Sequence, residues 1–368
     1  MSAPKVKILV CYHKVSPIIA NEVLRPILLG AESGDKHIQE VLESACAKQG
    51  VTLIRDNDIT QDNTIAGGGG YSHSLDSYET NLHSTNSSNR AESYQLKTHL
   101  SLLTHKEISA LNPYFCELTA MYWAWKNLDV DYYGLFHYRR VFDFTPHSFF
   151  ERLKQFFTPQ SHIIAKYRLE STFITSYLEN NHIDILIPKP LSLRQDINAY
   201  ENFARGGHNI ADLDKAIAYI QETYPFMSDS INQMLFTKGA KMCYWNIGIW
   251  RKEVFFAYCE WIFDVLFGIQ DKIAYKSYDS HQARVFGFLA EWLFNVWLHY
   301  YRHTHTLHIK ELKTELLYNK QSKFFGKVSS SDCERYYFLF VRVYKRMLPR
   351  KDDSTPPPPL ICKAYIKE

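Results

Sequence analysis

The sequence predicts an α/β fold in which helices pack against a mixed β-sheet. Short apolar runs typical of buried strands alternate along the chain with longer segments whose apolar residues repeat every 3.6 positions, as in helices. The chain has 368 residues, 46% of them hydrophobic, which is enough to bury a large core. We therefore expect one main domain over residues 1–315, followed by a C-terminal extension over 316–368.

The first elements are predicted from the N-terminal apolar pattern. The run over residues 7–12 is typical of a buried strand. We expect a loop over 20–30, a helix over 36–50 and a second strand over 51–54. Residues 56–105 are rich in Asn, Ser, Asp and Gly and include four consecutive glycines, which predicts a flexible insertion. Such a segment is typical either of a loop that closes over a site or of plain disorder.

The middle of the chain supplies the strongest patterns. A helix is expected to open at Asn112-Pro113 and to end near Asn127, and the apolar run 132–136 after it predicts a buried strand. The remaining expected elements are a strand over 183–188, a helix over 209–222, a strand pair or strand-turn over 240–250, and helices over 252–270 and 279–300.

The C-terminal extension differs in composition from the main domain. Residues 336–350 mix aromatic residues with four cations, Arg342, Lys345, Arg346 and Arg350. This pattern is typical of a segment that touches anionic lipid, or of a helix packed on the core. Four prolines at 356–359 then predict a stiff, extended tail.

Charge and cysteine content narrow the class of protein. The formal net charge is +3, with 42 basic against 39 acidic residues, so composition does not favour a nucleic-acid binder. Seven cysteines with no CxxC pair, and a start without a signal-peptide pattern, predict a reduced, cytoplasmic protein. No apolar run reaches the roughly 18 residues that cross a bilayer. Aromatic residues make up 15%, which suits sugar binding as well as core packing.

Cationic and imidazole side chains follow two of the predicted strands. In open α/β sheets, ligands bind at the carboxyl ends of the strands. Guanidinium groups match phosphate oxygens in a bidentate fork, so these residues predict a cradle for a diphosphate. The alternative is a surface arginine pair held in salt bridges. The residues concerned are His13 and Lys14 after the first strand, and His137, Tyr138, Arg139 and Arg140 after the strand over 132–136.

Several acidic and polar residues are further candidates. Asp129 and Asp131 form a D-x-D pair, but they precede their strand, so we interpret them as a turn between helix and strand and not as metal ligands. Arg284 and Glu291 lie two helical turns apart on one face, which suits a general base or an ion pair. His208 follows two glycines and is more often structural than catalytic in such a place.

Asn246 either binds a sugar hydroxyl or fixes a turn within an aromatic strand. The chain contains no Walker loop, GxGxxG, GxSxG, HExxH or clustered zinc ligands. Their absence removes the commonest ATPase, dehydrogenase, serine hydrolase and zincin interpretations.

Two segments resemble a known bacterial family. PYFCELTAMYWAWKN (113–127) and DYYGLFHYRR (131–140) are similar to the signature of the family catalogued as domain of unknown function 4422. That family occurs in capsule, exopolysaccharide and O-antigen (lipopolysaccharide) loci, and its members look like GT-A-type glycosyltransferases, some linked to galactofuranose transfer. Weaker similarity continues at 8–14, 185–189, 242–246 and 284–297, so the resemblance covers roughly residues 5–300.

The resemblance implies a GT-A-like, Rossmann-type mixed sheet flanked by helices, and transfer of galactofuranose or another hexose from a UDP-sugar by direct displacement. Glu291 is the first candidate for the base that deprotonates the acceptor, and Asp279 is the second. The implied donor-binding residues are His13, Lys14, His137, Tyr138, Arg139, Arg140, Arg284, Asn246, His208 and Glu117. A need for Mn²⁺ or Mg²⁺ is left open, because no D-x-D is well placed, although Asp143 lies just after the cations.

The implied acceptor is a growing bacterial surface glycan, free or lipid-linked, which places the enzyme in the cytoplasm or at the cytoplasmic face of the inner membrane. Two departures from the family stand out. Its DNTGDNIS-like stretch is reduced here to Asp62-Asn63-Thr64 before the long insertion, and its usual Glu-Arg pair is Glu291-Trp292. The alternative function is a non-catalytic carbohydrate-binding or scaffold component of a polysaccharide assembly complex.

Overall fold

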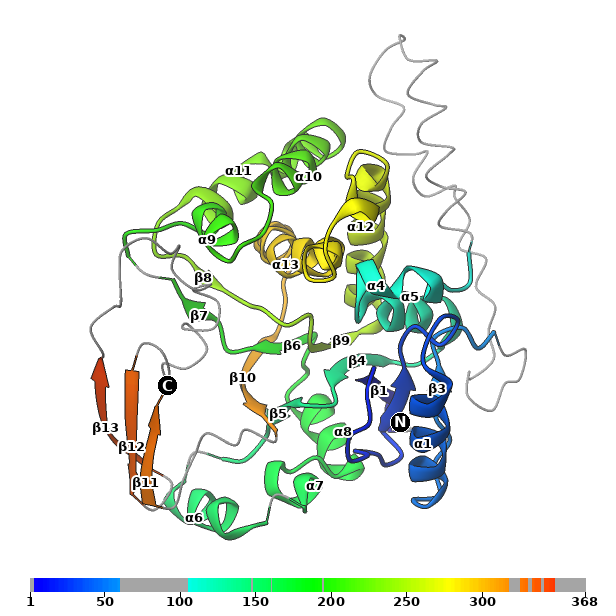
Figure 1. Cartoon of the computed structure of the whole chain (residues 1–368), viewed down its shortest axis with the longest axis vertical. Helices are drawn as coiled ribbons and strands as arrows, with labels where there is room; N and C mark the ends of the chain where they lie inside the picture. Colours follow the sequence, from blue (N-terminus) through cyan, green and yellow to red (C-terminus); the bar gives the residue numbers. More distant parts are fainter. Residues whose placement is uncertain are drawn as a thin grey trace.

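The protein is built around one large mixed β-sheet. The computed structural model describes residues 3–59, 105–146, 148–159, 161–193 and 195–317, and the backbone of three strands between 325 and 347. The large sheet has eight strands in the order β3-β2-β1-β4-β5-β10-β6-β9, and β9 also pairs with β4 (Figure 1). The predicted α/β fold class is confirmed.

The N-terminal half of this sheet is parallel. Its strands are β1 (Val6–Tyr12), β2 (Leu24–Leu28), β3 (Ile54–Arg55) and β4 (Tyr132–His137). Strand β1 lies between β2 and β4, with Tyr12 opposite Leu28 and Cys11 opposite His137. Because the pairing is parallel and in register, the segments that leave these strands all start from the same edge of the sheet.

The second half of the sheet contains both parallel and antiparallel strand pairs. Strand β5 (Arg140–Asp143) turns back from β4, so that Arg140 pairs with His137. Strand β10 (Ile309–Leu316) runs antiparallel to β5 and parallel to β6 (Ile185–Pro188), and β9 (Gly248–Arg251) closes the order. The sheet therefore uses the chain as far as residue 316.

Helices cover both faces of the sheet. On one face, α1 (Lys36–Ala47) and α8 (Ser171–Asn180) pack on a core that includes Ile8 and Val10 of β1. On the other face, helices α5 (Leu118–Asn127), α12 (Lys252–Gln270) and α13 (Val285–Thr304) pack on a core that includes Leu9 and Cys11. Successive β1 side chains point to opposite faces, so one strand contributes to both cores.

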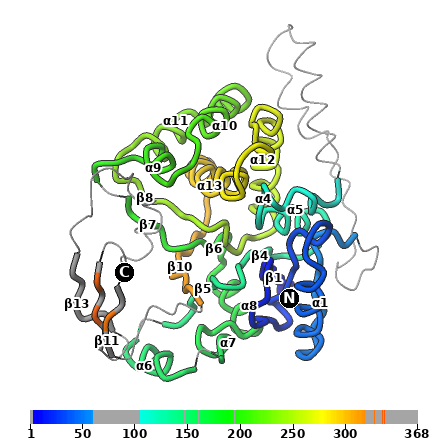
Figure 2. Tube along the Cα trace, viewed as in Figure 1, coloured from blue at the N-terminus to red at the C-terminus, as the bar shows by residue number. Residues whose placement is uncertain are grey.

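The other elements are short or peripheral, and Figure 2 follows the chain through them. They are η1 (Ser109–Leu111), α4 (Asn112–Phe115), α6 (Phe149–Phe157), α7 (Ile163–Tyr167), β7 (Leu191–Ser192), α9 (Ala199–Arg205), α10 (Ile210–Thr223), η2 (Pro225–Met227), α11 (Ser228–Ile231), η3 (Asn232–Phe236), β8 (Lys241–Met242), η4 (Tyr275–Ser277), η5 (Gln282–Arg284), β11 (Phe325–Ser329), β12 (Cys333–Phe338) and β13 (Val341–Met347).

Some expected boundaries were wrong for identifiable reasons. The loop expected over 20–30 contains strand β2, whose Leu24 is fully buried against β1. The strand expected over 51–54 is reduced to Ile54 and Arg55. The helix expected from Asn112 to Asn127 is broken into α4 and α5, because Cys116 between them adopts a left-handed φ of 53°. The last long helix begins at 285, after the short turn η5.

Two further expectations change at the edges of the main domain. Residues 56–59, placed with the flexible insertion, belong to the packed structure, and Asp56 is fully buried. Asp62-Asn63-Thr64 lie outside the described residues. The basic aromatic segment is not a helix, because β11, β12 and β13 form an antiparallel three-stranded sheet.

Candidate active site at the strand ends

Two histidines meet where β1 and β4 end. His13 follows β1 and His137 is the last residue of β4, and their ring centroids are 5.6 Å apart. The buried ring of Tyr138 packs against both, at 5.3 Å from His13 and 4.4 Å from His137. The two strand ends at which the cationic residues were predicted therefore lie side by side.

Both histidines are neutral at pH 7. Burial, followed by the charges of Lys14, Arg139 and Arg284, lowers the pKa of His13 to about 4. Burial, followed by Arg139, Arg140, His13 and Arg284, lowers the pKa of His137 to about 2. The two imidazoles can therefore offer an N–H group to a phosphate oxygen, while the positive charge of the site comes from the lysine and the arginines.

Arg139 carries an unused donor. Its Nε is buried without a hydrogen-bond partner, and in the described part of the chain it forms no ion pair. Its guanidinium carbon lies 5.9 Å from the centre of the Tyr138 ring, and that of Arg140 lies 5.6 Å from the centre of the Trp245 ring. Among the described residues, Arg139 therefore has no salt bridge of the kind that the alternative interpretation requires. A buried donor without a partner is costly, so an acceptor from outside the chain would stabilise it.

A strained turn places Asn246 beside Glu117. Trp245 and Asn246, between β8 and β9, have left-handed φ angles of 77° and 47°. Asn246 Nδ2 donates to Glu117 Oε1 at 3.2 Å and to the carbonyl oxygen of Gly287 at 3.0 Å. Asn246 therefore lies in a turn and not inside a strand, and it ties the start of α5 to the start of α13. Two consecutive non-glycine residues in this conformation are uncommon and are often found at functional sites.

Arg284 joins the same group of side chains from the end of η5. Its Nε donates to the Sγ of Cys116 at 3.2 Å, and its guanidinium carbon lies 5.1 Å from the centre of the Phe288 ring. Burial raises the pKa of the Cys116 thiol to about 12, so the sulfur accepts this hydrogen bond as a neutral group.

Glu291 is the carboxylate best suited to accept a proton. It lies on α13, partly buried, and burial followed by the charge of Glu117 raises its pKa to about 7. A hydrogen bond from the backbone N–H of Trp245 and the charges of Arg140 and Arg284 oppose this shift. A carboxylate with a pKa near 7 is suited to general base catalysis at neutral pH. Glu291 also lines a small cavity with Tyr244, Asn246 and Trp250.

The structure thus brings most of the predicted residues into one electrostatically coupled group. Arg284 acts on His13, His137 and Glu291, while Arg140 acts on His137 and Glu291. The group consists of His13, Lys14, Glu117, His137, Tyr138, Arg139, Arg140, Asn246, Arg284 and Glu291.

His208 lies beside this group. Its buried ring packs on Phe288, with centroids 4.1 Å apart, and neither ring nitrogen has a hydrogen-bond partner among the described residues. Burial, followed by the charges of His281 and Arg284, lowers its pKa to about 4. His208 is therefore a neutral imidazole that is within electrostatic range of Arg284.

Asp279 is placed differently from Glu291. It is exposed, and its Oδ1 accepts the N–H groups of His281 at 2.8 Å and Gln282 at 3.0 Å. These bonds hold the Asp279 carboxylate within the turn that leads into η5. Its neighbour Gln282 donates to the carbonyl oxygen of Gly207, so this turn is joined to the His208 loop.

The acidic residues considered for metal binding have protein partners. Asp129 pairs with Lys252 at 2.6 Å, and Asp131 accepts the backbone N–H of Lys5 at 2.7 Å, so their interpretation as a turn before β4 is confirmed. The carboxylate of Asp143 accepts hydrogen bonds from α6. Within the described ranges, no group of three or more His, Cys, Asp or Glu side chains is arranged to hold a metal ion.

Sequence reasoning missed three residues near the site. Cys116 and Trp245 contact Arg284 and Arg140, and although both lie in segments that resemble the family, neither was predicted as a site residue. The fully buried Asp56 accepts hydrogen bonds from the N–H of Gly30 at 2.7 Å, from Thr119 Oγ1 at 2.7 Å and from Ser109 Oγ. Asp56 follows β3 just as His13 follows β1, so the strand-end rule would have identified it.

Trp292, which stands where the family usually has arginine, is a core residue. Its side chain is buried, and Nε1 donates to the carbonyl oxygen of Ala199 at 2.9 Å. None of the helices that the structure describes is both long and apolar enough to cross a membrane.

Comparisons with known proteins agree with this architecture. The model of the family described as domain of unknown function (DUF4422) matches residues 87–304. A solved structure titled WbbM bifunctional glycosyltransferase, in its apo form, matches with a TM-score of 0.61 and 26% sequence identity. The match covers 89% of this chain and 47% of the solved one, so this chain spans about half the length of that protein. No curated protein matches.

The matched range contains both segments on which the resemblance was based, and the match to a glycosyltransferase structure makes the α/β sheet GT-A-like. The chain belongs to the family described as domain of unknown function (DUF4422).

Proposed function

We propose that the chain is a glycosyltransferase that moves a hexose, for which galactofuranose is our first choice, from a UDP-sugar to a growing bacterial surface glycan. The observation that carries the proposal is the group of side chains at the ends of β1 and β4, in which Arg140 and Arg284 lie within electrostatic range of the Glu291 carboxylate, whose pKa is about 7, and Arg139 acts on His137. The similarity to a solved glycosyltransferase supports the same reaction class.

The residues divide between two tasks. The arginines and Lys14 would bind the diphosphate and stabilise the charge that develops on the departing UDP. His13 and His137, which are neutral, would donate hydrogen bonds to phosphate oxygens. Because these groups lie at the carboxyl ends of β1 and β4, the diphosphate would lie across the same edge of the sheet.

Glu291 would act as the general base. As the acceptor hydroxyl attacks the anomeric carbon, its proton passes to the Glu291 carboxylate, and the bond from that carbon to the phosphate oxygen breaks with its electrons leaving on UDP. Glu117 raises the pKa of Glu291 and so increases its basicity, while Asn246 holds Glu117 in place. In this scheme Asp279, whose carboxylate is exposed and accepts two backbone N–H groups of its own turn, is the less suitable base.

Nucleotide binding is the first test. A ligand that binds only the native state raises the melting temperature. At a ligand concentration of a hundred times its Kd, the free energy of unfolding increases by about 2.7 kcal/mol. We expect UDP to stabilise the protein more than GDP, ADP or CMP, each measured with and without Mn²⁺. The Arg139→Ala variant should keep its own melting temperature but lose the UDP response. Absence of any nucleotide effect at millimolar concentration would reject the proposal and favour a carbohydrate-binding protein.

A further inference from the structure

Helix α6 exposes an apolar face to solvent. Its apolar residues are exposed as follows: Phe149 73%, Phe150 80%, Leu153 42%, Phe156 40% and Phe157 73%. At 100° per residue, these five positions lie on one side of the helix. A surface helix normally turns such a side toward the core, so α6 has the opposite orientation.

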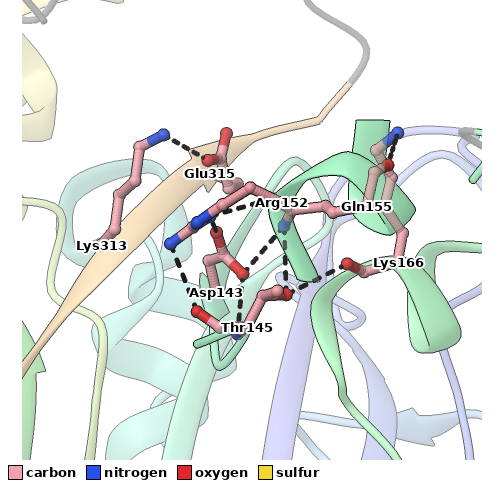
Figure 3. Close-up of polar contacts among 7 residues, drawn as sticks. All are labelled: Asp143, Thr145, Arg152, Gln155, Lys166, Lys313 and Glu315. Carbon is pink, nitrogen blue, oxygen red and sulfur yellow. Dashed lines mark hydrogen bonds and ion pairs between the residues drawn. The ribbon is translucent and has the colours of Figure 1, made fainter. Parts of the chain in front are cut away.

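The polar side of α6 holds the helix to the domain. Arg152 donates to Asp143 Oδ2 at 2.6 Å and to the carbonyl oxygen of Thr145 at 3.2 Å. Gln155 Nε2 donates to Asp143 Oδ1 at 2.9 Å and to Thr145 Oγ1 at 3.2 Å. Figure 3 shows both side chains reaching from α6 toward Asp143, which is buried in β5.

A second set of bonds fixes the end of the helix. Lys166 Nζ donates to the carbonyl oxygen of Gln155 at 3.1 Å and to that of Thr158 at 2.6 Å. To roll the apolar face inward, α6 would have to break its bonds to a buried carboxylate, which is costly. The outward apolar face is therefore built into the fold.

The charge around α6 indicates the occupant of this face. Arg152 is paired with Asp143, and among the other described residues from 148 to 168 the cations Lys154, Lys166 and Arg168 stand against one acidic residue, Glu151. Lys154 is exposed beside the apolar face. A helix with aromatic residues on one side and cations at its border is typical of a helix that lies in the surface of an anionic bilayer.

The size of the face argues against a second copy of this chain. Taking about 200 Å² for a whole aromatic side chain, the five residues expose roughly 600 Å². A stable protein–protein interface needs about 800 Å² from each partner. A helix of nine residues is about 13 Å long, which suits shallow insertion between lipid headgroups.

We propose that α6 is a membrane-docking helix, which lies in the surface of an anionic phospholipid bilayer with Phe149, Phe150 and Phe157 inserted below the headgroups. The exposure, bonding and charge of α6 are independent of the reaction at the strand ends. It places the lipid contact on a different element from the basic aromatic segment 336–350, which the sequence had indicated.

Co-sedimentation of the full chain with vesicles tests this. We expect binding to vesicles of phosphatidylcholine with phosphatidylglycerol, and weaker binding to phosphatidylcholine alone. Each inserted ring should contribute about tenfold to the affinity. The triple variant Phe149→Ser, Phe150→Ser and Phe157→Ser should therefore lose binding. The matched control is Phe226→Ser, which removes a ring that is 59% exposed on η2 and should leave binding unchanged.

Three outcomes would overturn the proposal: no binding of the unaltered chain to anionic vesicles, equal binding by the triple variant, or equal loss in the Phe226 control. Sedimentation velocity distinguishes the main alternative. If the chain is a dimer that the triple variant converts to a monomer, without any vesicle binding, the face is an interface between copies and the proposal is wrong. Circular dichroism of each variant verifies its folding.

Discussion

Replacing Glu291 by glutamine should abolish turnover and also stabilise the fold above neutral pH. Glutamine keeps the shape of the side chain and an oxygen for the Trp245 N–H, but it cannot accept the proton of the acceptor. A residue that only holds the structure together would show the opposite result, because removing it would reduce stability. Measuring activity and stability together therefore separates the two roles.

The size of the effect follows from the pKa of Glu291. Its pKa is about 7 in the folded protein against 4.5 for a free side chain. At about 1.4 kcal/mol for each pH unit, keeping it ionised in the fold costs up to about 3 kcal/mol. Because the pKa of Glu291 is higher in the folded than in the unfolded state, the free energy of unfolding of the wild type falls by this amount as the pH rises from 4.5 to 7. Above pH 7 this contribution does not change further. The glutamine side chain does not ionise, so the variant shows no such decrease in the free energy of unfolding.

The assay is thermal and urea denaturation of both proteins between pH 5 and 8.5, with UDP release measured in parallel. We expect similar stability at pH 5 and a variant that is more stable by about 1–3 kcal/mol at pH 8.5. The exposed carboxylate of Glu179 on α8 provides the control, since Glu179→Gln should change stability at neither pH. A Glu291→Gln variant with no pH-dependent gain, or with normal turnover, would refute the reasoning.

Three other changes have expected outcomes. Arg139→Ala should lower kcat/KM by about ten- to a hundredfold at unchanged melting temperature, as loss of one charge-assisted bond predicts, and steady-state kinetics measures it. Glu117→Gln removes a charge that raises the pKa of Glu291, so the acidic limb of the pH–rate profile should move to lower pH, and an unmoved limb would contradict the coupling. Asp143→Ala should cost about 2 kcal/mol in urea denaturation, because Arg152 and Gln155 lose their buried acceptor.

The sequence by itself determined the elements that rest on local patterns. The runs over 7–12 and 132–136 are strands, and the segment 252–270 is a helix over its whole length. It also placed His13 and His137 at the ends of two strands, and the structure then showed that these strands are parallel neighbours, which brings the two rings together. Periodicity and strand direction are sufficient for such predictions.

Only the tertiary structure decided what these residues can do chemically. The pKa of Glu291 depends on Glu117, which is 174 positions away in the sequence, and on burial that no local pattern encodes. The same holds for the neutral state of the two histidines, since desolvation depends on what the complete fold packs around them.

Tertiary structure also decided two other features. These are the strained backbone at residues 245 and 246 and the outward orientation of the apolar face of α6. The sequence of α6 shows that the helix is amphipathic, but not which side faces the domain. Asp143, at the end of the preceding strand β5, decides that, because the packed sheet buries its carboxylate, which must keep its hydrogen-bond donors, and these lie on the polar side of the helix.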